Sequence, residues 1–141
     1  MIKEIITDEE KLSIQCVDCN DPELIDQIVQ DLLDTAAANK DRCIGLAANQ
    51  IGYNYRIFIV LTDKGFVPFI NPEVVCMYGG VKQYYEACLS RPGQKPVRVR
   101  RYKKLKVKLS DNKGGEALII ATGIMGRCIQ HELDHCNGVL V

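Results

Sequence analysis

Residues 104–137 read KLKVKLSDNKGGEALIIATGIMGRCIQHELDHCN, and this stretch decides the fold. Apolar residues alternate with lysines over residues 104–110, which predicts a strand with one buried and one solvated face. The turn sequence DNKGG leads into a second apolar run, 116–122, so the two runs should pair as an antiparallel hairpin. A helix is expected to follow, with Thr122 at its N-cap, an end at Asn137 and a glycine directly after it.

Four shorter strand-like runs precede this stretch, and turn signals separate them. The runs are residues 56–61, 66–70, 74–78 and 81–87, divided by Asp63 to Gly65, by Asn71 and Pro72, and by Gly79 and Gly80. Nearer the start, residues 22–38 carry apolar side chains at helical spacing, with Asp21 as the N-cap and Pro22 in the first turn. Because the strands are grouped between a helix at each end, the sequence predicts an α+β fold, with mainly antiparallel β-sheets around the C-terminal helix and one N-terminal helix.

Length and composition narrow the class of protein. A chain of 141 residues is expected to form a single domain, 1–141, and its 47% hydrophobic and 26% charged content is typical of globular proteins. No apolar run is long enough to span a membrane, and the first residues lack the features of a secretory signal. The seven cysteines are an odd number, so we expect reduced thiols and a cytoplasmic location, without a membrane partner.

The net charge of zero hides a separation of charge along the chain. Residues 1–34 hold ten acidic residues against Lys3 and Lys11, whereas residues 91–108 hold nine lysines and arginines and no acid. The simpler interpretation is a pair of strands with solvated basic positions. The functional interpretation is a contact surface for an anionic partner such as RNA.

The only two histidines, His131 and His135, lie four residues apart on the expected C-terminal helix. This spacing places both imidazoles on one helix face, where they can bind the same cation. Glu132 projects about 100° round the helix from His131, which suits a general base that acts on water at the metal. The competing interpretation is a pair of ordinary histidines on an amphipathic helix.

A catalytic metal site usually takes three protein ligands, and no third histidine exists. The third ligand must therefore be Cys, Asp or Glu. Cys88 ranks first because it lies in EACLS, where a strand run gives way to a loop rich in proline and glycine. A catalytic thiol with histidine as its base is the alternative role. The other cysteines considered are expected to be buried core residues or to point away from the cation: Cys16, Cys19, Cys76, Cys128 and Cys136.

Three stretches together resemble the signature motifs of the peptide deformylase family, in order and spacing. They are CIGLAANQIG (43–52), EACLS (86–90) and QHELDH (130–135). The resemblance spans most of residues 20–141 and departs from the family pattern at Cys43 and Ala87, where glycine is usual. The chain ends a few residues after the metal helix, as in short members encoded by bacteriophages, whereas many bacterial members continue into a C-terminal extension.

This resemblance implies a set of functional residues. Cys88, His131 and His135 would bind one divalent metal ion, Fe²⁺ in the cell, with Zn²⁺, Ni²⁺ or Co²⁺ as substitutes. Glu132 would be the general acid and base, and the Gln50 amide and the Leu89 backbone N–H would stabilise the oxyanion. The residues expected to line the substrate path or to surround the methionine side chain are Ile44, Gly45, Leu46, Glu86 and Cys128, with the ring of His131.

The implied activity is hydrolysis of the N-formyl group from the formylmethionine of newly made polypeptides, with release of formate. The expected location is the bacterial cytosol, including that of a phage-infected host. Two other classes of protein stay open at this point. One is a metallopeptidase that acts on unformylated peptides, and the other is a module that binds ribosomal RNA through residues 91–108 and holds a structural metal.

Overall fold

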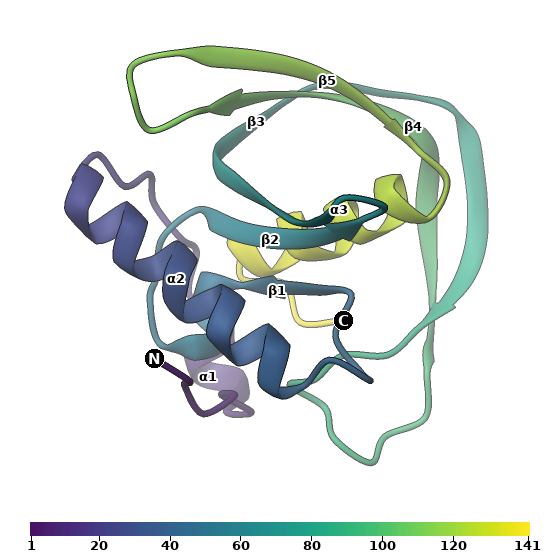
Figure 1. Cartoon of the computed structure of the whole chain (residues 1–141). Coiled ribbons are helices and arrows are strands. Elements are labelled where there is room, and N and C mark those ends of the chain that lie inside the picture. Colours follow the sequence, from purple (N-terminus) through teal and green to yellow (C-terminus); the bar gives the residue numbers. More distant parts are fainter.

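The computed structural model describes all residues, 1–141, and has the predicted α+β fold, in which the strands form one five-stranded sheet (Figure 1). The helices are α1 (Glu9–Leu12), α2 (Pro22–Ala38) and α3 (Gly123–Cys136), with a 3₁₀ helix, η1, at Ala48–Ile51. The strands are β1 (Gly45–Ala47), β2 (Ile57–Thr62), β3 (Gly65–Glu86), β4 (Val97–Ser110) and β5 (Glu116–Thr122). The strands follow one another in sequence order, and every neighbouring pair is antiparallel.

The two long helices cover opposite faces of the sheet (Figure 1). Helix α2 begins as predicted, because the Asp21 side chain accepts hydrogen bonds from the N–H groups of Glu23 and Leu24. Its apolar face packs with Ile57 and Ile59 of β2. Helix α3 packs on the other side of the same strand, where the next residues in the alternation, such as Phe58, point. Strand β2 is therefore buried on both faces, and α3 contacts β1, β2, β4 and β5.

The structure corrects the prediction of separate strands after β2. The runs 66–70, 74–78 and 81–87 belong to one long strand, β3, which ends at Glu86. The expected turns are irregularities in its pairing with β4, and the backbone there has positive φ at Asn71 (48°), Gly79 (81°) and Gly80 (88°). A register shift also falls between Val74 and Cys76. These residues bend the strand without ending it.

The same irregularity explains why the prediction of a buried Cys76 is wrong. After the register shift, Cys76 pairs with Lys106 on the outer face of the sheet and is exposed. The short elements α1, β1 and η1 were also not predicted, so the chain has two N-terminal helices in place of one. Thr122 does stand at the N-cap of α3, but its side chain makes no capping hydrogen bond.

The other expectations about the cysteines agree with the structure. All seven are free thiols, and Cys16, Cys19 and Cys128 are buried as predicted. Cys136 is also buried, and it is not among the grouped metal-binding atoms. No helix combines the length and the apolar character that a membrane crossing requires.

Candidate active site

The three predicted metal ligands meet in space. His131 and His135 are buried on one face of α3, and Cys88 lies in the segment directly after β3. Their donor atoms all lie within 4.8 Å of one another, and the Cys88 sulfur is 3.4 Å from His135 Nε2. Two imidazoles and one thiol therefore converge on one point, as the spacing on the helix and the family resemblance required.

Buried charges orient His131. Its Nδ1 lies 2.9 Å from a carboxylate oxygen of Glu86. Arg101 donates two hydrogen bonds to Glu86, at 2.8 and 3.2 Å, and a third to Asp134 at 2.7 Å. Because Nδ1 is engaged with Glu86, the other ring nitrogen of His131 is left for a cation, and this type of support fixes the ring orientation in metal sites.

The electrostatics of the site fit a bound cation. Burial opposes a positive charge on His131, but hydrogen bonds with Cys88 and Glu86 outweigh it and raise the pKa of His131 to about 10. These surroundings favour a positive charge, which a bound cation would supply in place of the proton. Burial and the neighbouring His131 lower the pKa of His135 to about 3, which keeps its imidazole neutral and able to act as a ligand. A thiolate with two imidazoles suits several divalent transition metals. The residues present therefore fit one such ion.

Glu132 stands beside the ligands without a partner. Its side chain is 3% exposed, and its Oε1 is buried with no hydrogen bond. Burial raises the pKa of Glu132 to about 7, so this carboxyl group can both take up and release a proton near neutral pH. Gly45 of β1 faces it closely, because a Cβ there would lie 2.6 Å from Glu132 Oε2. Only glycine leaves this carboxylate its present position.

Two hydrogen-bond donors lie on the other side of Cys88. The Gln50 side chain is fixed in η1, because its Oε1 accepts a hydrogen bond from Ala47 N–H at 3.0 Å. Its amide nitrogen donates to Ser90 Oγ at 3.0 Å and approaches the Cys88 sulfur at 3.5 Å. The backbone N–H of Leu89 has no acceptor in the protein. Both predicted oxyanion donors are thus close to the ligands.

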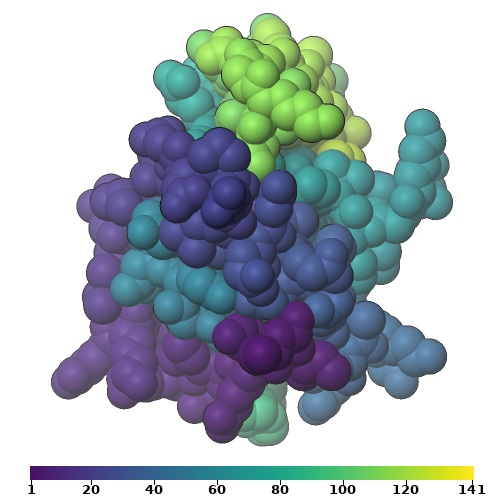
Figure 2. Space-filling view, turned by 60° about the vertical axis from the view of Figure 1, so that its left-hand side comes forward, coloured from purple at the N-terminus to yellow at the C-terminus, as the bar shows by residue number.

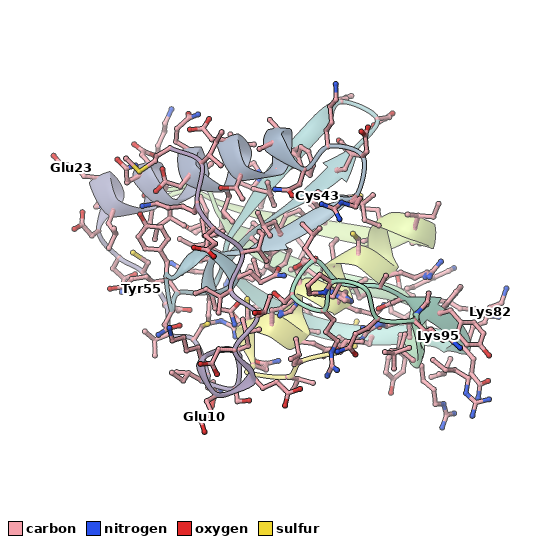
Figure 3. The ribbon with its side chains drawn as sticks, turned by 90° about the horizontal axis from the view of Figure 1, so that it is seen from below. Glu10, Glu23, Cys43, Tyr55, Lys82 and Lys95 are labelled. Carbon is pink, nitrogen blue, oxygen red and sulfur yellow. The ribbon has the colours of Figure 1, made fainter.

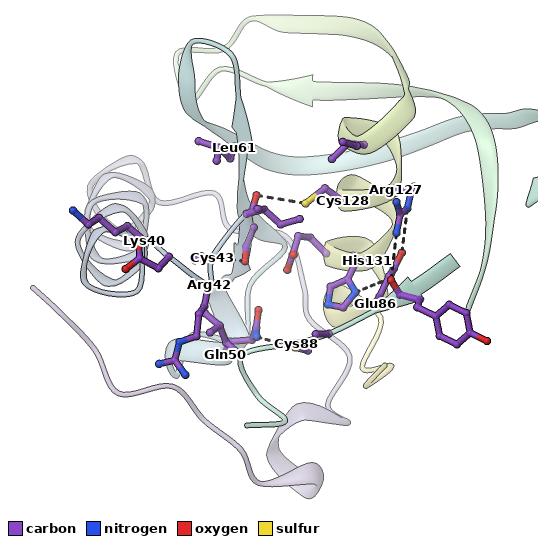
Figure 4. A pocket seen from close by; sticks show the side chains of 18 residues that line it. Lys40, Arg42, Cys43, Gln50, Leu61, Glu86, Cys88, Arg127, Cys128 and His131 are labelled. Atoms are coloured by element: carbon purple, nitrogen blue, oxygen red, sulfur yellow. Dashed lines mark hydrogen bonds and ion pairs between the residues drawn. The ribbon is translucent and has the colours of Figure 1, made fainter. Parts of the chain in front are cut away.

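A cavity of about 580 Å³ opens beside these groups (Figure 4). Four of the residues predicted to contact substrate line it, namely Ile44, Gly45, Glu86 and Cys128, and so do Glu132, Gln50 and Leu89. The Cys128 thiol donates a hydrogen bond to the Ile44 carbonyl at 3.4 Å across one wall. Leu46 differs from the expectation, because its side chain is fully buried in the core under α2 and does not line the cavity.

Three residues near the site were not singled out from the sequence. Ser90 is buried and accepts the hydrogen bond from Gln50, and the Arg127 guanidinium lines the cavity 3.8 Å from the centre of the Tyr84 ring. Arg101 was counted with the basic stretch 91–108, but it is buried and paired with carboxylates. The signal in the sequence was the strand alternation. Arg101 lies an even number of residues before the buried Leu105 and Val107, so its side chain points to the same face of β4.

Comparison with known proteins identifies the family of this chain. The family model for polypeptide deformylase matches residues 2–141. Peptide deformylase 1 of Clostridium perfringens is 40% identical over 139 residues, which cover 94% of this chain and 90% of that protein. A peptide deformylase of Clostridium beijerinckii is 32% identical over the full length of both chains. These relatives are bacterial, so the expected likeness to bacteriophage members is not confirmed.

Solved structures of peptide deformylases also resemble this chain. The crystal structure of a peptide deformylase from Ehrlichia chaffeensis in complex with actinonin matches with a TM-score of 0.88 and 30% identity, over 99% of this chain and 86% of that one. The sequence motifs, the converging ligands, the family model and these relatives agree, and the chain belongs to the peptide deformylase family.

Proposed function

We propose that Cys88, His131 and His135 hold the catalytic cation of this deformylase and that Glu132 moves the proton during hydrolysis of the formyl group. The observation that carries the proposal is the convergence of the three donor atoms within 4.8 Å, next to a buried carboxylate that has no other partner. One catalytic domain, 1–141, supplies all these groups.

The reaction adds water to the formyl carbon and breaks the bond from that carbon to the methionine nitrogen. A divalent cation held by these three residues would supply Lewis acidity, which lowers the pKa of water toward neutrality. Glu132 accepts a proton from the attacking water and passes it to the methionine nitrogen as the C–N bond breaks. The products are formate and a peptide with a free N-terminal amine.

Gln50 and Leu89 stabilise the negative charge that develops on the formyl oxygen. Gln50 has two amide hydrogens: Ser90 accepts one at 3.0 Å, and the other points to the Cys88 sulfur at 3.5 Å, a long contact that the developing oxyanion replaces. The free N–H of Leu89 supplies a second donor. Each such donor contributes about 3 kcal/mol to transition-state stabilisation in measured cases.

The cavity beside Glu132 takes the methionine side chain. Ile44 and Cys128 form its apolar lining, and Gly45 leaves room for the substrate backbone beside β1. Strand β1 is at the edge of the sheet, so its outer backbone groups can pair with an extended peptide. Leu46 contributes here through its backbone only. We expect actinonin, which is bound in the Ehrlichia chaffeensis structure, to compete for this cavity.

Three finer parts of the function are also proposed. The ion in the cell is Fe²⁺, because the family resemblance implies it and a mixed sulfur and nitrogen ligand set accepts it. The enzyme works in the bacterial cytosol, where formylated chains are made. Residues 91–108, without the buried Arg101, make a weak contact with ribosomal RNA there.

The test is a formate-release assay on formyl-Met-Ala-Ser under anaerobic conditions, with metal analysis of the same sample. We expect one divalent ion per chain and release of formate. Glu132→Gln should abolish release while the metal content stays the same, because the carboxylate is not a ligand. Unchanged activity of this variant would overturn the role of Glu132.

A peptidase activity is tested in the same experiment. An unformylated Met-Ala-Ser peptide and a longer internal peptide should remain intact, since the site offers donors for one small formyl oxygen beside the cation. Cleavage of these peptides without formate release would favour the metallopeptidase instead.

A further inference from the structure

Strand β4 carries a row of side chains that the active site does not use. Alternate residues of β4 point away from α3, and we call this row the outer stripe: Arg98, Arg100, Tyr102, Lys104, Lys106 and Lys108. The residues between them face α3, where Arg101, Leu105 and Val107 are buried. The alternation of one strand therefore places five of the basic residues of the stretch 91–108 in a single file on the outer face.

Most of these charges have no counterion. Arg98, Arg100, Lys104 and Lys106 form no ion pair in the structure, and only Lys108 has one, with Glu116 at 3.3 Å. Their direct neighbours on the adjoining strands are uncharged. On β3 these neighbours are Tyr85, Gln83, Tyr78 and Cys76, and on β5 they are Thr122 and Ile120. Four adjacent cations are left open to an anionic partner.

Aromatic rings stand among these cations. Tyr102 is part of the outer stripe and is 42% exposed. Tyr78 lies beside the stripe, 38% exposed, with Lys104 Nζ 6.0 Å from its ring centre. Tyr85, opposite Arg98, is 70% exposed. Exposed rings next to cations provide flat surfaces for stacking bases.

Building on the RNA contact proposed above for residues 91–108, we propose that the outer stripe binds single-stranded RNA along β4. Alternate residues of a strand are about 6.7 Å apart, which is close to the distance between neighbouring phosphates of an extended strand. Proteins that bind single strands combine such a line of cations with aromatic stacking platforms. A row of cations with exposed rings among and beside them matches that pattern better than it matches a membrane-binding surface, which requires a broad apolar face.

The surroundings of the stripe guide an RNA strand toward its Arg98 end. Near Lys108, the β4–β5 hairpin projects above the acidic N-terminal end of α2 (Figure 2), and Asn112 in its turn contacts Asp26. Glu10 and Glu23 lie on one side of the molecule, and Lys95 lies at the far end of the other side (Figure 3). The bound strand would run beside the active-site cavity and leave the metal ligands free.

The test measures binding of a fluorescent twelve-nucleotide oligouridylate by anisotropy over a range of salt concentrations. Four phosphate contacts on a single strand predict a slope of log affinity against log salt of about −2.8. The double variant Arg100→Glu, Lys104→Glu should bind at least about 10-fold more weakly at low salt and lose about half of this slope. The matched control is Lys82→Glu, Lys103→Glu, which makes the same change in net charge on the opposite face of the same strands and should retain most of the binding.

Stacking has its own test at Tyr102. Tyr102→Ala should weaken binding by about 5-fold or more, whereas Tyr102→Phe keeps the ring and should bind like the native protein. All variants should hydrolyse formyl-Met-Ala-Ser at the native rate, which shows that they fold and separates this inference from the deformylase mechanism. Equal losses in the two charge variants, or Tyr102→Ala binding like Tyr102→Phe, would overturn the proposal. So would binding to phosphatidylserine vesicles or to a poly-glutamate peptide with no binding to the RNA.

Discussion

The α-carbon of Gly45 faces Glu132 so closely that a methyl group on it would lie 2.6 Å from Glu132 Oε2 and 3.2 Å from the Cys128 sulfur. The contact joins the edge strand β1 to α3, two elements far apart in the sequence. A side chain at position 45 cannot fit unless the Glu132 carboxylate moves.

We therefore predict that Gly45→Ala lowers kcat/KM for formyl-Met-Ala-Ser by at least about 10-fold, because a proton-transfer group displaced by about 1 Å loses much of its effect. The metal content should stay the same, since Gly45 touches no ligand. Steady-state kinetics and metal analysis of one preparation check this. Native kinetics in Gly45→Ala would contradict this prediction, because they would show that the Glu132 carboxylate can shift without loss of activity.

Arg101 is predicted to support both the fold and the metal site. Arg101→Leu removes the main partner of Glu86, whose side chain is only 9% exposed, and this costs about 3 kcal/mol or more of unfolding free energy. Loss of the support for His131 should also weaken metal binding by about 10-fold to 100-fold. Denaturant unfolding and metal titration measure these effects. The control is Arg100→Leu, an exposed neighbour that makes no ion pair and should change the unfolding free energy by less than about 0.5 kcal/mol.

Asp31 is predicted to make stability depend on pH. Its side chain is buried, which by itself raises the pKa, but hydrogen bonds from Tyr53, the N-terminal ammonium and Gln27 lower it overall. A lowered pKa in the folded state stabilises the protein above the unfolded pKa of about 4, and this stabilisation is lost as the pH falls below it.

The variant Tyr53→Phe tests that pH dependence. Removal of the hydroxyl should cost about 1 kcal/mol at pH 7 and less at pH 3, where Asp31 begins to be protonated. Tyr55→Phe is the control, because the Tyr55 hydroxyl makes no hydrogen bond in the protein. Chemical denaturation at several pH values gives the comparison. A cost that stays constant from pH 7 to pH 3 would contradict the role of the carboxylate.

Exposure of the enzyme to oxygen tests which metal ion it contains. If the ion is Fe²⁺, air or peroxide should inactivate the enzyme, because Fe²⁺ and the Cys88 thiolate can both be oxidised. Reconstitution with Ni²⁺ should restore activity and keep it stable in air. Time courses of formate release from the iron and nickel forms measure this, and equal stability of the two forms would argue against iron.

Local patterns in the sequence predicted much of the fold. The alternation in residues 104–110, the turn after it and the cap at Asp21 depend on neighbours within a few residues, and the structure has β4, β5 and α2 at these places. The prediction failed along β3, because bulges at Asn71 and Gly79 have the same residue types as turns. Whether such residues end a strand depends on the partner strand, which the local sequence does not contain.

In the candidate site, too, some features follow from the local sequence and others depend on the tertiary structure. The sequence by itself determined that His131, Glu132 and His135 share one helix, because their relative directions follow from the helical repeat. Only the tertiary structure brought Cys88 to them, buried Arg101 against Glu86 and placed Gly45 against Glu132. These contacts join residues distant in the chain, and they depend on how the sheet curves around α3. The helical repeat acts over a few residues, whereas packing and buried charge act across the whole domain.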